Sequence, residues 1–428
     1  MVIGIDASRA NREHKSGVEW YSYYLIRWLA KLDKDNQYIL YTDAPLRGGL
    51  LDLRTKQYYP DQNGGEEIYD RKGYQIIKSP FNNFKAKILK WPFKYLWTQG
   101  RMSLEMLFCR PDILFVPAHT LPVVHPGKSI VTIHDIGFER ERRLYQKEEM
   151  GPESTRARKL LNIFIKIFTL GKYRADTIDY FRWSTAYALK KAIKIITVSN
   201  FTKRELTSYF GADPDKIKVV YNGYNKEVYR KIDDEGGIRN VLEKYGIERP
   251  YLLYVGRIER KKNIPTLIEA FSILKENKDI KHKLILVGDA SYGYDETKYM
   301  INEFDLSNEV IMPGWLPELD MPYLYNGADA FIFPSVYEGF GIPPLQAIAC
   351  GIPVAASNSS SIPEVVGNAA LLFNPDDPYD MAAVFKKIIT DKNIRELLLI
   401  AGDEHIKNFS WEKCARETLK EITDMNSR

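Results

Sequence analysis

The sequence has few cysteines and no long apolar run, and both absences narrow the class of protein. Its three cysteines lie far apart in 428 residues, without a CxxC pair. They therefore provide neither a disulfide framework nor a zinc site, and they fit a reducing compartment. A membrane-spanning helix needs about 18 apolar residues in a row, and the longest attempt, 160–170, is interrupted by Lys166. The first residues resemble a buried strand rather than a signal peptide, so we expect a soluble, cytoplasmic protein.

Several common motifs of catalysis are missing as well. No GxGxxG follows the first strand and no GxxxxGK occurs, which argues against dinucleotide and P-loop chemistry. GxSxG and HExxH are also absent. Two DxD strings, 33–35 and 213–215, have a spacing that can hold a divalent metal on a diphosphate. The first follows a helix end and the second is a turn before a strand, so we predict no metal site and no bound cofactor.

Charge is close to balanced, and only its distribution is informative. The net charge of +5 is small for this length and does not indicate nucleic-acid binding. Between Lys72 and Arg110, however, eight basic residues accompany one acid, Glu105, and aromatic residues are interleaved with them from position 81 to 97. Such a stretch, 72–110, suits a surface that faces anionic lipid headgroups. The alternative is a solvated helix that keeps its aromatic residues in the core.

Apolar strand-like runs alternate with helix-like runs, the pattern of parallel α/β sheets. The length predicts two domains, at 1–225 and 226–410, with 225–249 as the linker region and 411–428 as a C-terminal segment that can pack back on the first domain. Residues 47–72 have the composition of an inserted loop. The expected strands are Val2–Asp6, Tyr38–Tyr41, Gln75–Ile77, Ile113–Phe115, Ser129–Ile133, Lys194–Val198, Lys218–Val220, Tyr251–Val255, Lys283–Val287, Val310–Met312, Ala330–Phe333, Val354–Ala356 and Leu371–Phe373.

Two loops that follow strands carry residues suited to phosphate. Gly17 stands where a helix begins after the first strand, and free N–H groups there favour an anion, although a plain turn glycine would look the same. Arg257 and Lys262 follow the strand Tyr251–Val255, before an N-cap candidate, Asn263. Ligands of open α/β sheets bind at the carboxyl ends of strands. The two cations can therefore neutralise a diphosphate, or they form a solvated basic loop.

The segment 334–354 is the most informative in the chain. It follows a buried strand, contains a turn flanked by glycines, and continues as a helix that ends at Gly351. Glu338 would lie at the tip of the loop as an acceptor for sugar hydroxyls. Backbone N–H groups of Phe340, Gly341 and Ile342 would face a ligand at the start of the helix. Gln346 lies eight residues after Glu338, on a side that can face a ribose.

At this point the chain resembles a known family, the retaining glycosyltransferases of family GT4. The resemblance spans nearly the whole chain. Several of its motifs are weak indicators of the family when taken singly, but together, in this order and spacing, they are specific for it. They are Ser16-Gly17-Val18, Thr132-Ile133-His134-Asp135, Val198-Ser199-Asn200, Tyr221-Asn222-Gly223, Val255-Gly256-Arg257 with Lys262-Asn263, Gly314-Trp315, and the segment that begins at Glu338.

The resemblance implies a GT-B fold, with two Rossmann-like domains whose parallel sheets face across a cleft. It further implies hexosyl transfer from a nucleoside diphosphate sugar, GDP-mannose or a UDP-sugar, to a glycan or lipid-linked acceptor in cell-surface polysaccharide or glycolipid synthesis. It makes His134, Glu338, Arg257 and Lys262 catalytic. His119 ends another strand-to-helix segment, and this position makes it a candidate on the acceptor side. The implied donor-binding set is Gly17, Val18, Arg257, Lys262, Gly314, Trp315, Glu338, Gly339, Phe340, Gly341, Ile342 and Gln346.

One position departs from the family pattern. The second glutamate of the E-x7-E motif is Gln346 in this chain, and in the family that carboxylate binds the ribose hydroxyls. A glutamine still accepts and donates hydrogen bonds, but it lacks the charge. We therefore expect altered donor binding rather than loss of activity. We expect the protein to be cytoplasmic, with a peripheral position on the inner face of the cytoplasmic membrane as a further possibility. Two alternatives remain for its function: a nucleotide-sugar epimerase of similar fold, and a non-catalytic scaffold that binds a sugar nucleotide at the membrane.

Overall fold

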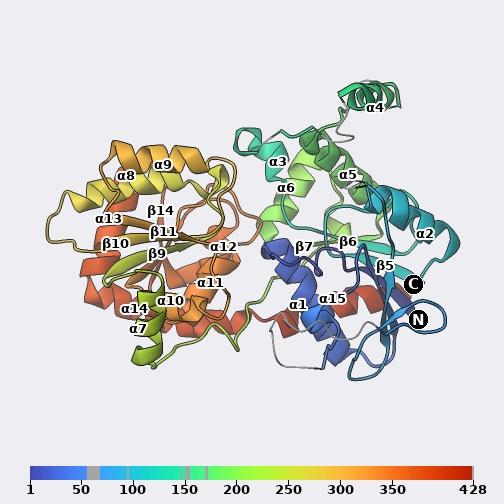
Figure 1. The fold of residues 1–428 in the computed structure, drawn as a ribbon, viewed down its shortest axis with the longest axis horizontal. Helices are drawn as coiled ribbons and strands as arrows, with labels where there is room; N and C mark the ends of the chain where they lie inside the picture. Colours follow the sequence, from blue (N-terminus) through green and yellow to red (C-terminus); the bar gives the residue numbers. More distant parts are fainter. Residues whose placement is uncertain (55–67, 94–95, 146, 150–154, 169–171, 427–428) are drawn as a thin grey trace. The chain divides into compact units, whose positions relative to one another are not determined.

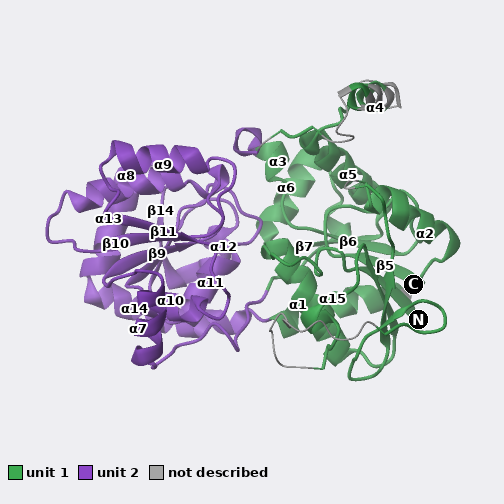
Figure 2. Cartoon of the chain, viewed as in Figure 1, with its two compact units in different colours: residues 1–140, 147–222, 411–428 green, residues 141–146, 223–410 purple. Residues whose placement is uncertain are grey.

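The computed structural model describes the chain except for residues 55–67, 94–95, 146, 150–154, 169–171 and 427–428. The described residues form two compact units, each built on one sheet (Figure 1). Unit 1 comprises residues 1–140, 147–222 and 411–428, and unit 2 comprises 141–146 and 223–410 (Figure 2). The α/β class is confirmed. The expected inserted loop at 47–72 lies partly outside the described residues.

The sheet of unit 1 has the strand order β3-β4-β2-β1-β5-β6-β7-β8. Its pairs are parallel except β3 with β4. The central strand β1 pairs through Ile3 with Tyr38 on one side and Ile113 on the other. The strands are β1 Val2–Asp6, β2 Gln37–Thr42, β3 Gln75–Ile76, β4 Phe84–Ile88, β5 Ile113–Val116, β6 Ser129–Ile133, β7 Lys194–Thr197 and β8 Ile217–Val219.

The sheet of unit 2 is wholly parallel, in the order β11-β10-β9-β12-β13-β14. In chain order this is 3-2-1-4-5-6, the Rossmann arrangement, and the direction of the strand order reverses between β9 and β12. Ligands of such sheets bind beyond the carboxyl ends of the strands at that reversal. The strands are β9 Tyr251–Val255, β10 Lys283–Val287, β11 Val310–Gly314, β12 Ala330–Phe333, β13 Val354–Ser357 and β14 Ala370–Phe373.

Helices cover both faces of each sheet (Figure 1). Those of unit 1 are α1 Gly17–Leu32, α2 Ser103–Phe108, α3 Gly137–Arg140, α4 Thr155–Phe168, α5 Thr177–Lys191, α6 Asn200–Phe210 and α15 Trp411–Thr423. Those of unit 2 are α7 Glu235–Lys244, α8 Ile264–Lys275, α9 Tyr294–Glu303, α10 Met321–Gly327, α11 Ile342–Ala349, α12 Ile362–Val366, α13 Pro378–Thr390 and α14 Lys392–His405. None of the helices in the described part of the chain has the length and apolar character that a bilayer crossing needs.

The C-terminal helix α15 packs against α1 within unit 1. The ring of Trp411 stacks on Tyr24 at a centroid distance of 5.2 Å and meets Tyr21 edge-on at 6.2 Å. Cys414 and Ile422 continue the buried side of α15. Helix α1, the first helix of the chain, therefore covers the apolar stripe of α15.

Strand β4 lies inside the stretch 72–110 and was not among the expected strands. Phe84 is buried and stacks on Tyr38 at 4.2 Å, while Lys85 lies over the ring of Tyr74 at 4.0 Å. The alternation Phe-Lys-Ala-Lys-Ile has the period of two that a strand requires. The reading of this region as a solvated helix is therefore wrong for residues 84–88.

Candidate functional site

An ion pair between Lys262 and Glu338 lies where the strand order of unit 2 reverses. Lys262 ends a short 3-10 turn after β9, and Glu338 lies in the loop after β12, the strand next to β9. The Lys262 ammonium group donates to Oε1 of Glu338. Their side chains are only 13% and 10% exposed. The fold thus joins one cation and one carboxylate that the sequence separates by 76 positions.

The loop that carries Glu338 is held by hydroxyl groups from the next strand connection. Ser361 donates to the carbonyl oxygens of Glu338 and Phe340, at 2.9 and 3.0 Å. The N–H group of Glu338 donates to Oγ of Ser360 at 3.0 Å, and Ser357 donates to the Ser335 carbonyl at 2.6 Å. Sequence reasoning missed these serines. The available signal was the polar run 357–361, which begins at the last residue of β13, at the same sheet edge as Glu338.

The N-terminus of α11 follows the same loop. Its N-cap, Gly341, has φ of 98°, a left-handed conformation that favours glycine, and no side chain caps the helix. Pro343 and Pro344 have no N–H group, so the donors of the first turn are concentrated around Ile342. Backbone donors and the helix dipole make this end a suitable position for a phosphate group. Gly339 and Phe340 lie directly before it, with Phe340 itself buried.

Arg257 supplies a second cation at the end of β9. Its carbonyl accepts a hydrogen bond from the Tyr254 hydroxyl at 3.0 Å, so the backbone is fixed while the side chain is exposed. A Cβ on Gly288, at the end of the neighbouring strand β10, would lie 1.9 Å from the Gly256 carbonyl oxygen, and only glycine fits there. Within the described residues no carboxylate pairs with the Arg257 guanidinium group, which leaves its charge available to a ligand.

Two further regions of the expected donor set lie in unit 2, at the end of β11 and on α11. Gly314 ends β11 with φ of 83°, and the following Trp315 is 51% exposed. Since β11 is two strands from β9, this end lies roughly 10 Å from the end of β9. On α11, the side-chain amide oxygen Oε1 of Gln346 accepts from the buried Tyr325 hydroxyl at 3.3 Å. Burial raises the pKa of Tyr325 well above its ordinary value, so this hydroxyl stays a donor.

His134 lies in unit 1, at the carboxyl end of β6. It is buried, its ring meets Tyr21 edge-on at 4.8 Å, and its carbonyl accepts from the Thr202 hydroxyl at 3.2 Å. Nε2 lies 3.0 Å from the carbonyl oxygen of Pro117. Because a carbonyl can only accept, Nε2 carries the proton and Nδ1 is left as a hydrogen-bond acceptor.

His119 stands beside His134, at the end of the adjacent strand β5. The ring centroids are 5.7 Å apart, and Nε2 of His119 is 2.9 Å from the Asp135 carbonyl. Burial lowers the pKa of His134 to about 4, and His119 contributes in the same direction. Burial also lowers the pKa of His119, although the charge of Asp135 opposes the shift. Both imidazoles are therefore neutral at pH 7, fit for hydrogen bonding to hydroxyl groups rather than for anion binding.

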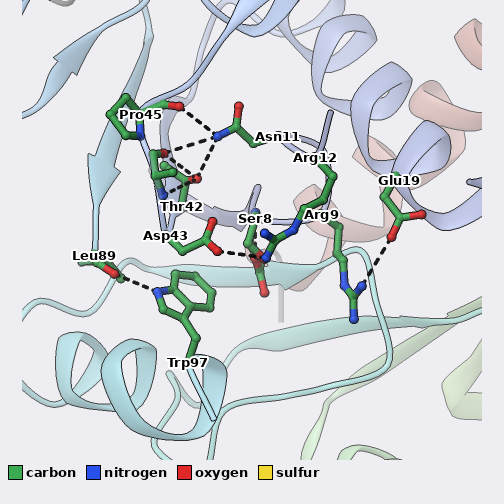
Figure 3. Close-up of polar contacts among 12 residues, drawn as sticks. Ser8, Arg9, Asn11, Arg12, Glu19, Thr42, Asp43, Pro45, Leu89 and Trp97 are labelled. Atoms are coloured by element: carbon green, nitrogen blue, oxygen red, sulfur yellow. Dashed lines mark hydrogen bonds and ion pairs between the residues drawn. The ribbon is translucent and has the colours of Figure 1, made fainter. Parts of the chain in front are cut away.

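The loop from β1 to α1 is tied to its surroundings by polar side chains (Figure 3). Arg12 pairs with Asp43 at 2.9 Å, and Asn11 donates to the Pro45 carbonyl at 2.9 Å. Gly17 is the first residue of α1 and is exposed, with Val18 next to it. The carboxylate of Glu19 accepts from Ser16 and from Arg9, so one anion already occupies this helix end. A phosphate at Gly17 would have to share the first turn with it.

The depressed pKa of His134 has a consequence for stability. An unfolded chain binds a proton on histidine near pH 6.5, whereas folded His134 does so only near pH 4. In that window the unfolded state binds more protons, so stability rises with pH. We expect the contribution of neutral His134 to be complete above pH 6.5 and to be lost as the pH falls toward 4. The measurement is the unfolding midpoint of the wild type and of His134→Gln from pH 7.5 to 4.5. A constant difference between them would contradict the assignment.

Comparison with known proteins now gives the family. The model of "Glycosyltransferase Family 4" matches residues 15–228, and that of "Glycosyl transferases group 1" matches 238–404. The O-antigen chain mannosyltransferase B of Escherichia coli is 34% identical over 257 residues, which are 60% of this chain and 67% of that protein. The serotype-specific mannosyltransferase WbdA of the same species is 32% identical over 238 residues, 55% of this chain but only 29% of WbdA.

A solved structure shows the same fold over the whole chain. The Anabaena protein HepE, in complex with UDP-glucose, superposes with a TM-score of 0.66 at 15% identity, and the match covers 99% of each chain. At this identity the likeness concerns the fold alone. Together with the strand orders above, it confirms the expected two-domain GT-B architecture.

Proposed function

This chain belongs to glycosyltransferase family 4, and we propose that it moves a hexosyl group from a nucleoside diphosphate sugar to an acceptor hydroxyl with retention at the anomeric carbon. That it is a glycosyltransferase follows from the family. The donor, the stereochemistry and the acceptor are the proposed part. The observation that carries the donor assignment is the largely buried Lys262–Glu338 pair at the strand-order reversal of unit 2, next to the uncapped N-terminus of α11.

We assign the donor to unit 2 because the positive charges and N–H donors suited to a diphosphate lie there. Arg257, Lys262 and the N-terminus of α11 offer positive charge or N–H donors to a diphosphate, and they stabilise it as it leaves. Glu338 accepts hydrogen bonds from the sugar. Trp315 and Gly314 lie farther along the sheet edge, on the side for the base, and Gln346 serves the ribose. The ammonium group of Lys262 has three N–H donors, so it can contact a phosphate oxygen while it donates to Glu338. Because Lys262 and Arg257 can together offset the charge of the diphosphate, we propose that turnover requires no metal ion.

Retention is best explained by attack from the face that the diphosphate leaves. A double displacement would need a free carboxylate as nucleophile. Glu338 is held in an ion pair with Lys262, which favours its use as a hydrogen-bond acceptor over covalent attack. In the proposed mechanism the leaving phosphate oxygen helps to deprotonate the acceptor. His134 holds a hydroxyl of the transferred sugar through Nδ1, and His119 lies on the acceptor side.

The names of the relatives guide the choice of substrates. Two E. coli relatives are named mannosyltransferases, one of them for the O-antigen chain, and HepE was solved with UDP-glucose. We propose GDP-mannose as the first donor to test, and a glycan or lipid-linked acceptor of cell-surface polysaccharide synthesis. Such an acceptor places the enzyme at the inner face of the cytoplasmic membrane as a peripheral protein.

The experiment is incubation of the full chain with GDP- and UDP-sugars, with and without candidate acceptors, followed by detection of free nucleoside diphosphate and of product. Slow release of GDP or UDP, stimulated by an acceptor and insensitive to EDTA, is the expected result. Formation of a new sugar nucleotide would instead identify an epimerase. Binding of the donor without turnover, with lipid acceptors present, would identify a scaffold. NMR of the anomeric proton in the product tests retention.

Position 346 gives a separate prediction. Gln346→Glu should lower the KM for the donor about five- to tenfold, because a carboxylate binds ribose hydroxyls about 1 kcal/mol more strongly than an amide. The Tyr325 hydroxyl can still donate to either side chain. Titration calorimetry with the nucleoside diphosphate checks the effect without chemistry. Tyr325→Phe is the matched control, since it removes the neighbour and leaves Gln346. Equal affinity of wild type and Gln346→Glu would place the ribose elsewhere.

A further inference from the structure

Helix α2 of unit 1 exposes an apolar stripe that the proposed chemistry does not use. Leu104, Leu107 and Phe108 are 49%, 50% and 80% exposed. Their spacing of three and four positions places them on one side of the helix. Met106 and Ser103 are buried on the other side. A surface helix normally keeps polar residues outward, so this stripe indicates a contact outside the chain.

The stripe continues across a turn to helix α5. The N–H group of Val123 donates to Gln99, in the turn before α2, at 3.0 Å, and the Val123 carbonyl accepts from the Tyr187 hydroxyl of α5 at 2.8 Å. Val123 itself is 43% exposed. On α5, Trp183 stacks on Tyr187 at a centroid distance of 5.5 Å. We call this surface the α2–α5 face; its residues are Leu104, Leu107, Phe108, Val123, Trp183 and Tyr187.

Basic side chains are exposed at the ends of both helices of the α2–α5 face. Arg110 follows α2, and Lys190 and Lys191 end α5; all three are exposed. The acidic residues within the two helices, Glu105 and Asp179, are both paired with basic side chains of the chain. The face therefore presents apolar and aromatic side chains with an excess of positive charge.

Helix α4, next to the start of α5, carries further positive charge. The N–H group of Ala175, just before α5, donates to Asn162 of α4 at 2.7 Å. The described exposed side chains of α4 include Arg156, Lys159 and Lys166, with Ile163 54% exposed among them. The sequence of α4 contains no acid. Basic and apolar side chains on one helix are typical of elements that lie on a membrane.

We propose that the α2–α5 face docks on an anionic lipid surface. The leucines and Phe108 would enter the boundary between headgroups and acyl chains, Trp183 and Tyr187 would lie at headgroup level, and the lysines would attract anionic lipid. A symmetric contact between two copies through this face would bring like charges together, which disfavours a dimer. Docking on lipid does not depend on the proposed enzymatic activity. Only its role, which is to bring the enzyme to a lipid-linked acceptor, rests on the proposed function.

The test is co-sedimentation of the full chain with vesicles of phosphatidylglycerol and phosphatidylcholine. We expect binding that weakens as salt is raised, and little binding to vesicles of phosphatidylcholine alone. Leu107→Glu with Phe108→Glu should lower the vesicle-bound fraction at least tenfold. The matched control is Leu397→Glu with Ile400→Glu on α14 of unit 2, at positions 66% and 59% exposed. This control should bind as the wild type does.

Two further measurements distinguish a failure of lipid docking from a failure of the proposed enzymatic function and from dimer formation. Release of nucleoside diphosphate without vesicles should be equal in the wild type and in Leu107→Glu with Phe108→Glu. If neither protein released it, the proposed function would be overturned, while the result on lipid docking would still stand. Light scattering reports the oligomeric state. Unchanged vesicle binding of that variant overturns the proposal, as does a loss of dimer without a change in vesicle binding. Charge reversal of Lys190 and Lys191 should also weaken binding, and most at low salt.

Discussion

Replacing Lys262 by alanine should lower kcat/KM for the donor about 10²- to 10³-fold, the usual effect of removing one preorganised group that stabilises a leaving anion. The loss should be mainly in kcat, because charge on the diphosphate develops as the sugar departs. The same substitution leaves Glu338 buried without its cation. Breaking such a pair typically costs about 3 to 5 kcal/mol of stability. Steady-state kinetics and unfolding by urea therefore have to be measured together.

Two controls separate chemistry from stability in that experiment. Arg257→Ala removes a cation from the same sheet edge, but its side chain is exposed and no carboxylate among the described residues pairs with it. It should lower kcat about 10²-fold and change stability by no more than about 0.5 kcal/mol. Glu338→Gln in the Lys262→Ala background removes the unpaired charge and should restore stability without restoring kcat. If Lys262→Ala kept turnover within a few-fold of wild type, the diphosphate would not be bound here.

Most of the fold could be predicted because the strands of parallel sheets are short apolar runs. Ser129–Ile133, Tyr251–Val255 and Ala330–Phe333 coincide with observed strands, since buried strands carry a continuous apolar signal. Strand β4 was missed because its lysines and the aromatic residues around it suggested a surface. The exposed stripe of α2 lies in the same stretch, and six residues are too few for a helical period to stand out from the sequence.

The charged residues of the candidate site could be predicted from the sequence, but the residues that hold them in place could not. Arg257, Lys262 and Glu338 stand out because cations and a carboxylate follow strands directly. That Lys262 pairs with Glu338 depends on β9 and β12 being neighbours, which only the strand order reveals. The same holds for Ser360 and for Tyr325, whose hydroxyls reach residues about twenty positions away. A single sequence does not show such contacts.

Replacing His134 should also have a large effect, about 10²-fold on kcat for His134→Ala, if its Nδ1 holds the transferred sugar. The structure gives the two ring nitrogens different tasks. Nε2 donates to the Pro117 carbonyl and fixes the ring, while Nδ1 is the acceptor that remains. Because burial lowers the pKa of His134 to about 4, this arrangement should persist down to about pH 5, and kcat should not fall through protonation of this residue above that pH.

Two amide substitutions distinguish these tasks. An asparagine at 134 can place its carbonyl oxygen near the position of Nδ1 but cannot reach Pro117. A glutamine can donate to Pro117 from near the position of Nε2 but offers no acceptor at Nδ1. If the sugar hydroxyl donates to Nδ1, His134→Asn should keep at least tenfold more kcat than His134→Gln, while His134→Gln should be the more stable of the two. The reverse order of kcat would mean that His134 acts by holding the loop at Pro117, and that its contact with the sugar contributes little to catalysis.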